Sequence, residues 1–422
     1  MNAYKTKAAM GRWAADRAAF RTLAQVFLQL RTPLIRRRRS FTAILSLGQN
    51  GHAYNAARAV KALGHRVLLI TDTPQLPEMA YADALLLRNP LTEIETILTD
   101  LEDFQLEAVL VSIYNTLLPA QDRIATRFGL ISTGSQSAAF SNDKLAWRDA
   151  LADAGVAQPL YSPDPADFEG RACIRKARLG SGSEGVIPLR PEDDKVPYSG
   201  PEFFFEAVIE GDQYDVEGVM DDGAPRFLAR VYESFIQHND TFVSHYYLFN
   251  PPIDPAQRAA LDACASATLA ASRVENGAFH VEMFVTGDRV EPTDFGNRMG
   301  SYVRFVSFAS GVDFAQSHAN CFLPRKHTLV SQEPRALLQY FCWTQDQFDR
   351  ACAIRDANPE RVFDANMTAH TICGERCLGM IAFFHDNHAA LLKMTEGLGI
   401  RPPKRLDLGT YGSALAQSSD PV

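Results

Sequence analysis

The sequence predicts a mixed α/β protein, in which a parallel α/β domain precedes a region of α+β structure. From residue 41 onward, short apolar segments alternate with amphipathic ones, as at 41–47, 54–63 and 66–71. Such alternation is typical of a parallel sheet whose strands are joined by helices. After residue 140 the pattern changes to strands joined by tight turns, with Asp221-Asp222-Gly223 as the strongest hairpin signal.

The composition is that of an ordinary soluble globular chain. Of its 422 residues, 46% are hydrophobic and 22% are charged, which excludes a disordered or fibrous protein. The net charge is −8, from 42 Lys and Arg against 50 Asp and Glu. This acidic balance argues against general nucleic-acid binding, which needs a dominant basic face. No apolar run reaches the ~18–20 residues of a membrane span, so we expect none.

The seven cysteines indicate a reducing compartment, and we therefore expect a cytoplasmic protein. Their number is odd and their spacing irregular, unlike a disulfide framework. His370, Cys373 and Cys377 form the only tight cluster. It lacks a second half with ligand spacing, so buried thiols that pack a helix are favoured over a zinc site.

The N-terminal stretch 1–35 is predicted to be helical. Trp13, Phe20 and Phe27 recur at seven-residue spacing, which favours an amphipathic helix packed on its own chain or on a partner subunit. A homodimer is therefore left open. The alternative is a helix on a membrane surface, because four arginines, 36–39, follow directly. A twin-arginine export signal is rejected, since the following apolar stretch is short and reads better as a first strand.

Further elements follow from the same patterns. The turn at 48–52 lacks a complete GxGxxG, so dinucleotide binding is disfavoured there. Strands are expected at 85–87, 108–112, 171–176, 203–206, 213–220, 227–231, 279–284 and 289–295, and helices at 140–154 and 256–274. From residue 336 we expect two or three helices, with a strand at 380–384 and a helix at 388–397.

One segment has the features of an anion-binding loop. Lys176 ends a predicted strand and precedes the run Gly180-Ser181-Gly182-Ser183-Glu184-Gly185. Glycines let the backbone approach phosphate oxygens, and successive N–H groups can point at them. The lysine adds a positive charge for the same phosphates. The segment is not a Walker P-loop, because no Gly-Lys-Ser or Gly-Lys-Thr ends it and strands follow it.

A second constellation lies on two later strands. Because side chains alternate along a strand, His280 and Glu282 share one face of the first strand. Asp294, Gly296 and Arg298 share one face of the second. If the two strands pair, two carboxylates and an arginine converge. Carboxylate oxygens suit Mg²⁺, and arginine suits a developing oxyanion.

These motifs resemble those of the ATP-grasp superfamily. Lys176 and the run 180–186 match its glycine-rich loop in register, with Ala177 in place of the usual proline. Further similar segments follow in the family's order over roughly residues 41 to 330: Ser141–Lys144, Phe205–Gly211, Tyr214–Val219, Gly277–Glu282 and Asp294–Gly300. Within the superfamily, the last two are most similar to L-amino-acid ligase and related carboxylate–amine ligases.

The resemblance implies an ATP-grasp fold, with a parallel pre-ATP-grasp α/β domain and two α+β subdomains that sandwich ATP. It also implies five divisions of the chain. They are a helical extension, the pre-ATP-grasp domain, a lid subdomain, a large subdomain with the metal site, and a C-terminal extension that completes the ligase domain: 1–40, 41–140, 141–230, 231–330 and 331–422.

The resemblance further implies roles for particular residues. Phosphates would be held by Lys144, Lys176, Ser181, Gly182, Ser183 and Gly185, adenine by Glu206, Val208 and Ile209, and the ribose by Gln213. Glu282, Asp294 and Asn297 would bind Mg²⁺ or Mn²⁺, and Arg298, His280 and Lys176 would act in catalysis. The second metal strand departs from the family pattern. Asp294 replaces a glutamate, Gly296 replaces an asparagine, and Asn297 falls on the wrong face unless a bulge intervenes.

The implied activity is ATP-dependent ligation of a small-molecule carboxylate and amine, at least one of them an amino acid. The acid becomes an acyl phosphate, the amine displaces phosphate, and ADP is released. The aromatic stretch 232–247, with Tyr302 and Arg304 nearby, would line the substrate pocket and suits an apolar or aromatic substrate part. The alternatives are an ATP-grasp carboxylase or purine-pathway-like ligase, and a non-catalytic ATP-binding regulator. A nicotinamide-dependent oxidoreductase has only the incomplete turn in its favour.

Overall fold

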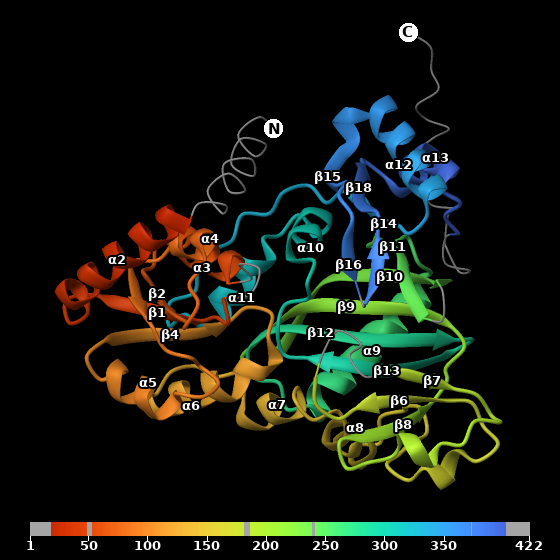
Figure 1. Ribbon diagram of the computed structural model, residues 1–422, viewed down its shortest axis with the longest axis horizontal. Helices are drawn as coiled ribbons and strands as arrows, with labels where there is room; N and C mark the ends of the chain where they lie inside the picture. The colour runs from red at the N-terminus through yellow and green to blue at the C-terminus, as the bar shows by residue number, and fades with distance from the viewer. Residues whose placement is uncertain (1–17, 49–52, 181–185, 239–240, 373, 402–422) are drawn as a thin grey trace.

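The N-terminal domain is built on a four-stranded parallel sheet in the order β3–β2–β1–β4 (Figure 1). The computed structural model describes residues 18–48, 53–180, 186–238, 241–372 and 374–401. The strands are β1 (Ser40–Leu45), β2 (Val67–Ile70), β3 (Ala84–Leu86) and β4 (Gln105–Val111), and the helices are α3 (Tyr54–Ala62), α4 (Leu76–Met79), α5 (Ile94–Leu101) and α6 (Leu118–Phe128). Every residue of β2 is buried, as in a sheet covered on both faces. The predicted parallel α/β architecture is confirmed.

Helix α2 (Ala18–Ile35) packs on the edge of this sheet beside β3. The Thr32 hydroxyl accepts a hydrogen bond of 2.9 Å from the Leu85 backbone N–H, and Leu28 is buried. The prediction of a helix is confirmed for 18–35, while Trp13 lies outside the described residues. In the described ranges, no helix is both long and apolar enough to cross a membrane.

The centre of the molecule is an eight-stranded antiparallel sheet in the order β13–β12–β9–β10–β11–β14–β18–β15. Its strands are β9 (Asp212–Asp221), β10 (Ala224–His238), β11 (Thr241–Phe249), β12 (Gly277–Thr286), β13 (Arg289–Gly296), β14 (Ala336–Cys342), β15 (Val362–Asn366) and β18 (Gly379–His385). The expectation of helix from residue 336 is wrong at its start, because β14 is a strand. All seven β14 residues are buried, and such a run has no periodicity that separates strand from helix.

A smaller antiparallel sheet, in the order β5–β8–β6–β7, lies beside the large one. It contains β5 (Tyr161–Ser162), β6 (Cys173–Ala177), β7 (Ile187–Leu189) and β8 (Phe203–Ala207). The predicted strands at 171–176 and 203–206 are therefore confirmed. Of the glycine-rich loop between β6 and β7, residues 181–185 lie outside the described residues, as do 49–52 of the predicted turn.

Helices cover both faces of the large sheet. On one face, α8 (Lys144–Asp153) and α9 (Pro255–Ala271) pack with α12 (Gln345–Ala357) and α13 (His388–Met394). On the other lie α10 (Val303–Ser310) and α11 (Phe314–Phe322), which the sequence did not predict. The single helix expected at 140–154 is instead two helices, α7 (Ser135–Phe140) and α8. Asp143 separates them and caps α8 by accepting from the Leu145 and Ala146 N–H groups.

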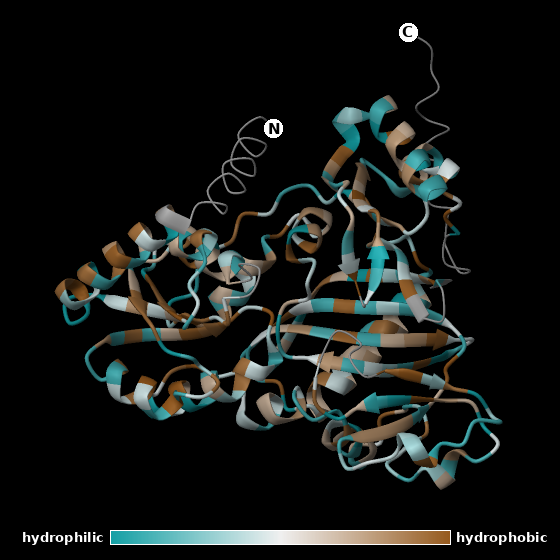
Figure 2. Cartoon of the chain, in the orientation of Figure 1, coloured by the Kyte–Doolittle hydropathy of each residue, from teal (hydrophilic) through white to brown (hydrophobic). Residues whose placement is uncertain are grey.

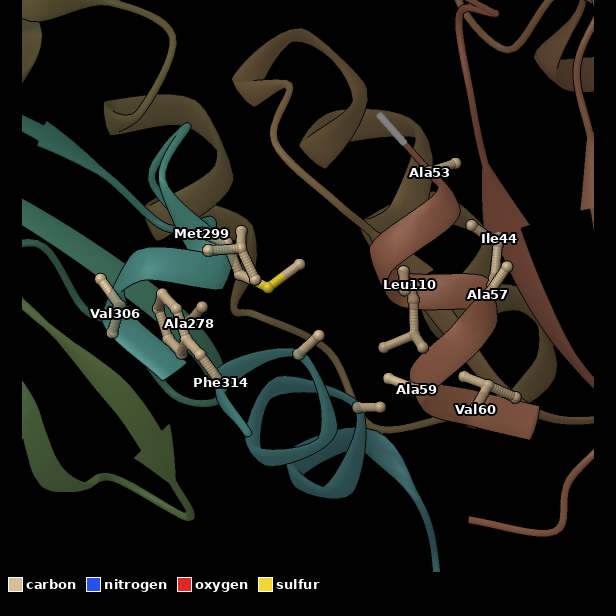
Figure 3. Close-up of a cluster of buried hydrophobic side chains, with 14 of the residues drawn as sticks. Ile44, Ala53, Ala57, Ala59, Val60, Leu110, Ala278, Met299, Val306 and Phe314 are labelled. Carbon is tan, nitrogen blue, oxygen red and sulfur yellow. The ribbon is translucent and has the colours of Figure 1, made fainter. Parts of the chain in front are cut away.

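One hydrophobic core joins the parallel domain to the large sheet. Figure 3 shows Ala57 and Val60 of α3 on one side of this cluster and Ala278 and Met299 on the other. Between them, His318 of α11 accepts from the Ala278 N–H at 2.8 Å and donates to the Val111 carbonyl at 2.8 Å. The two parts are therefore fixed by both apolar packing and buried hydrogen bonds.

Two members of the predicted cysteine cluster, His370 and Cys377, lie on a two-stranded hairpin of β16 (His370–Ile372) and β17 (Glu375–Cys377). The expectation that its thiols pack a helix is wrong for Cys377. This residue is buried in β17, and its thiol contacts the Gly379 carbonyl at 3.3 Å. Cys373 lies outside the described residues.

Candidate active site

The strand register places three carboxylates in one row across adjacent strands. Asp294 of β13 lies opposite Glu282 of β12, and Glu282 lies opposite Asp215 of β9. In the next row, His280 lies between Gly296 and Glu217. The prediction that β12 and β13 pair and bring Glu282 beside Asp294 is confirmed. The sequence analysis included Asp215 and Glu217 only within the motif Tyr214–Val219. The strand register adds both residues to the candidate site.

His280 is held between two of these acids. Its Nδ1 lies 2.5 Å from Glu217 Oε1, and its Nε2 lies 3.1 Å from Glu282 Oε1. Burial lowers the pKa of His280, but the Glu217 and Asp215 carboxylates raise it more, so the ring is held as an imidazolium. Since each ring nitrogen contacts a carboxylate, His280 is arranged to hold Glu217 and Glu282 in position.

The face around His280 gathers several buried acids. Burial raises the pKa of Asp215 to about 6, and burial together with the Asp215 carboxylate raises that of Glu233 well above its usual value. Asp215 Oδ1 and Glu217 Oε2 are buried and have no hydrogen-bond partner. Ligand atoms of Asp215, His280 and Glu282 lie within 4.8 Å of one another. Orphaned buried carboxylate oxygens of this kind fit a hard divalent cation.

The two predicted phosphate-binding lysines lie at the edge of the carboxylate row. Lys144, at the start of α8, forms an ion pair with Asp294. Lys176, at the end of β6, lies 2.6 Å from Glu206 Oε2 and donates to the Thr293 carbonyl at 3.1 Å. Burial raises the pKa of Asp294, but Lys144 and Lys176 lower it more, so it lies well below its usual value. The lysines come from different elements and meet at one strand, β13.

Glu206 is a positioning residue for Lys176. Its carboxylate is almost fully buried and also lies 2.6 Å from Nε of Arg148, whose side chain is completely buried. Burial raises the pKa of Glu206, and the Arg148 and Lys176 charges lower it further than burial raises it. Arg148 donates in turn to the Pro292 carbonyl at 2.7 Å. The sequence reasoning missed Arg148, although it lies one turn after Lys144 on the same helix face.

A β-bulge in β13 explains how these cations reach the backbone. The register passes from Glu282 opposite Asp294 to Met283 opposite Pro292, which leaves Thr293 as the extra residue. The Thr293 carbonyl accepts from Lys176 Nζ at 3.1 Å and from Arg148 at 3.3 Å. The bulge thus turns one carbonyl out of the sheet and toward the cations.

Asn297 does not join the carboxylates, and we leave it out of the metal site. It is fully buried beyond the end of β13. Its amide oxygen accepts from the Ser137 hydroxyl at 2.8 Å, and its NH₂ donates to the Ala278 carbonyl at 2.8 Å. The bulge lies before Asp294 and does not turn Asn297 toward the site. Its side chain instead ties α7 to the start of β12.

Gly296 provides room for Arg298. A Cβ at position 296 would lie 3.2 Å from Nε of Arg298 and 3.0 Å from Oδ1 of Asn115. Both distances are tighter than ordinary van der Waals contact. The half-buried Arg298 donates to the Met299 carbonyl at 3.2 Å and lies beside the His280 row. A side chain at position 296 would therefore press on Arg298 in this chain.

The predicted adenine and ribose residues lie where the small sheet meets the large one. Val208 and Ile209 connect β8 to β9, and Val208 is exposed. Gln213 is buried and donates to Glu233 Oε2 at 3.3 Å, so a ribose hydroxyl would compete with that contact. The predicted loop residues Ser181, Gly182, Ser183 and Gly185 lie outside the described residues.

A cavity of about 440 Å³ opens at the base of the glycine-rich loop, between β6 and β8. Its lining comes from both strands and from the residue that caps α8: Asp143, Ala177, Arg178, Leu179, Pro201, Glu202 and Phe203. Arg178 lies 2.5 Å from Asp143, which holds the loop base against α8. Two of these lining residues, Asp143 and Ala177, are the sequence neighbours of Lys144 and Lys176.

The aromatic residues that were predicted to line a substrate pocket lie on two faces of the large sheet. Tyr232 and Tyr246 belong to the hydrophobic core on the far face of the sheet. Tyr247 and Tyr302 lie on the carboxylate side, in ring contact at 5.7 Å, and the Tyr302 hydroxyl donates to Asp215. Because side chains alternate, a stretch of aromatic residues on one strand supplies both faces. Arg304 lies 3.1 Å from Asp364 on β15 and is half exposed.

Comparison with known proteins agrees with this architecture. Residues 189–303 match the family model of the ATP-grasp domain. L-amino acid ligase from Bacillus licheniformis is similar with a TM-score of 0.67 at 16% identity, over 86% of this chain and 98% of that one. Phosphoribosylglycinamide synthetase from Anaerococcus prevotii gives 0.64 at 14% identity, over 85% and 97%.

A third similar structure is N5-carboxyaminoimidazole synthase from Aspergillus clavatus, in complex with ADP and 5-aminoimidazole ribonucleotide. It gives a TM-score of 0.64 at 14% identity, over 86% of this chain and 98% of that one. A search of curated protein sequences gives no match. At these identities the similarity establishes the fold. Residues 189–303 thus match the ATP-grasp domain model, and the chain as a whole has the fold of these solved ligases.

Proposed function

We propose that this protein is an ATP-dependent ligase that joins a carboxylate to an amine through an acyl phosphate, with an amino acid as at least one substrate. The observation that carries the proposal is the meeting of Lys144 and Lys176, from two different elements, beside a row of three carboxylates. The lysines supply positive charge for phosphates, and the carboxylates supply hard oxygen ligands. The ATP-grasp fold and the similarity to ligases support the same reading.

The nucleotide would lie between the small and the large sheet. Lys144 and Lys176 would exchange their carboxylate partners for phosphate oxygens, while Arg148 keeps Glu206 charged and in place. The backbone of 208–209 would hold the adenine, and Gln213 would face the ribose. The loop 181–185 would cover the phosphates and exclude water, since a solvent-exposed acyl phosphate hydrolyses.

Glu282 and Asp294 would hold Mg²⁺ or Mn²⁺, with Asp215 as a further oxygen ligand in the same row. When bound, the ion would neutralise charge on the transferred phosphoryl group. His280 then keeps Glu217 and Glu282 in fixed positions through its two ring nitrogens.

The proposed reaction has two steps. A substrate carboxylate oxygen attacks the γ-phosphorus of ATP, and the bond from that phosphorus to the bridging oxygen of ADP breaks. The amine nitrogen then attacks the acyl carbon, the carbon–oxygen bond to phosphate breaks, and the amine proton leaves with solvent or phosphate. Arg298 would stabilise the charge that develops on the acyl oxygen. The protein's work is positioning and charge neutralisation.

A carboxylase or purine-pathway-like ligase is the second candidate, because two of the similar structures act in that chemistry by name. The regulator alternative would be favoured by nucleotide binding without turnover on amino acids, formate or bicarbonate. A cytoplasmic location stays part of the proposal. It is supported by six cysteines of the described residues that are all free thiols.

The test is ADP release with magnesium and ATP, measured for amino acids singly and in pairs, and separately with formate and bicarbonate. We expect release that needs two substrates, with an amide product in the mass spectrum. Lys176→Met should lose at least roughly a hundredfold in rate. Lys326→Met, which removes an exposed lysine paired with Asp221, should behave like the unaltered protein. Release driven by bicarbonate or formate alone would favour the second candidate.

A further inference from the structure

Helix α2 presents an apolar face to solvent. Six of its large hydrophobic side chains are 45–71% exposed: Phe20, Leu23, Val26, Phe27, Leu30 and Leu34. Their spacing of three and four residues places them on one side of the helix. The opposite side is the one that packs on the N-terminal domain, where Leu28 and Thr32 are buried. Figure 2 shows hydrophobic colour along the outer side of α2, at the edge of the molecule.

Exposed large hydrophobic side chains are concentrated on this α2 apolar face. Fourteen large hydrophobic side chains are exposed among the described residues, and six of them lie in this one helix. The other eight are scattered singly between residues 91 and 330. Single exposed apolar side chains are ordinary, whereas a contiguous apolar patch on a folded protein marks an interaction site.

The segment that contains this face is strongly basic. Residues 1–39 contain ten Lys and Arg and a single Asp, a net charge of +9, in a chain whose total is −8. The remaining residues therefore carry −17. From 18 to 39 all charged residues are arginines, six of them. Arg36 lies 2.9 Å from Asp103, Arg37 pairs with the same acid, and Arg38 and Arg39 are exposed.

The charge distinguishes between two partners that could cover the face, a second copy of the chain and a lipid surface. A second copy of the chain would bring together two helices whose charged residues, Arg21 and Arg31, are both arginines, each followed by the arginines 36–39, and neither copy offers an acid between 18 and 39. An anionic lipid surface supplies the missing negative charge, and its acyl boundary takes up the leucine and phenylalanine side chains. An interfacial helix combines these features, an apolar side with aromatic residues and flanking basic residues.

We propose that α2 docks the protein on an anionic membrane surface, with the α2 apolar face in the headgroup boundary and Arg38 and Arg39 on lipid phosphates. This is surface binding and not a membrane crossing, consistent with the absence of a spanning helix in the described ranges. In Figure 1, α2 lies at the outer edge of the molecule, away from β12 and β13, so docking leaves the candidate site open. The inference is independent of the proposed reaction.

The test is flotation of the full-length protein with vesicles. We expect it to float with vesicles of phosphatidylcholine and phosphatidylglycerol, and to float less with phosphatidylcholine alone or at high salt. The variant Phe27→Glu/Leu30→Glu should reduce binding roughly tenfold or more, because it places two charges in the acyl boundary. The matched control Leu160→Glu/Val330→Glu changes two exposed apolar residues elsewhere and should bind normally. Arg38→Gln/Arg39→Gln should lose the preference for phosphatidylglycerol.

These variants change exposed side chains, so each should keep the melting temperature of the unaltered protein. Equal flotation of the Phe27→Glu/Leu30→Glu variant and its control would overturn the proposal, as would no flotation with either vesicle. Sedimentation velocity tests whether a second copy of the chain covers the face instead. A dimer that becomes monomeric in this variant, without vesicle binding in the unaltered protein, would assign the face to a second copy and overturn lipid docking.

Discussion

Arg148 decides whether Lys176 has a fixed position. The two cations share Glu206, and all three groups are buried or nearly so. An arginine with no exposed area is unusual, and it persists here because a carboxylate and two carbonyls satisfy its guanidinium. Sequence reasoning found Lys144 and Lys176 because they occupy family motifs. It missed Arg148 because burial of a charge depends on packing between α8, β8 and β13, which no local pattern reports.

The first prediction concerns that buried pair. Arg148→Met should destabilise the protein by about 3–5 kcal/mol, because it leaves Glu206 buried with only Lys176 as a partner. Urea unfolding measures the loss. The double variant Arg148→Met/Glu206→Met should lose less than the single one, since no unpaired carboxylate then remains buried. A single variant that unfolds at the same urea concentration as the unaltered protein would show that Arg148 does not stabilise this site.

The second prediction concerns the space at Gly296. A methyl group there would press on Arg298 and Asn115, while the backbone needs no positive φ, so the fold should tolerate it. We expect Gly296→Ala to lower kcat roughly tenfold by displacing Arg298, with little change in melting temperature. Gly397→Ala is the matched control, because its new Cβ would lie 3.8 Å from Ile354. Equal rates in both variants would show that the Arg298 position does not limit turnover.

At the scale of elements, the sequence predicts best where periodicity and turns agree. The β12–β13 hairpin is found because alternating side chains flank a glycine turn, and its pairing brings Glu282 beside Asp294. Strand β14 is missed because its seven residues are all buried and carry no alternation. The bulge at Thr293 is also missed, since an extra residue in one strand leaves no mark in the sequence.

The third prediction concerns His318, which joins α11 to β4 and β12. Its Nδ1 accepts from the Ala278 N–H, and its Nε2–H donates to the Val111 carbonyl, so the folded protein needs the neutral ring. Burial lowers the pKa of His318 to about 4, against an ordinary value of 6.5. Its contribution is therefore complete above pH 6.5 and is lost as the pH falls toward 4. Over that range the loss is about 3 kcal/mol.

Urea unfolding at pH 7 and at pH 4.5 tests this. The His318→Gln variant should be less stable at pH 7 but should lose less stability between the two pH values than the unaltered protein. Other groups titrate in the same range, so the difference between the two proteins is the informative quantity. Equal losses of stability in both proteins would show that the acid sensitivity arises from other groups.

At the scale of the whole molecule, the candidate site is a product of strand order. Asp215, Glu233, Glu282 and Asp294 come from four strands separated in sequence by up to about eighty residues, and the order β13–β12–β9–β10 makes them neighbours. The sequence identified two of these acids through motifs. It could not identify this gathering of acids, because they become neighbours only once the sheet is formed.

The last prediction follows from that gathering of acids. A folded protein that gathers carboxylates with orphaned oxygens is stabilised by a cation that the unfolded chain does not bind. Magnesium or manganese should therefore raise the melting temperature without any substrate. At a hundredfold excess over the dissociation constant, the free energy of unfolding should rise by about 2.7 kcal/mol. Thermal unfolding with and without the ion measures this. Glu282→Gln/Asp294→Asn should melt at the same temperature in both conditions. Glu333→Gln, an exposed acid outside the site, should keep the full response. A response retained by the double variant would place the ion elsewhere, even if the enzyme forms an amide.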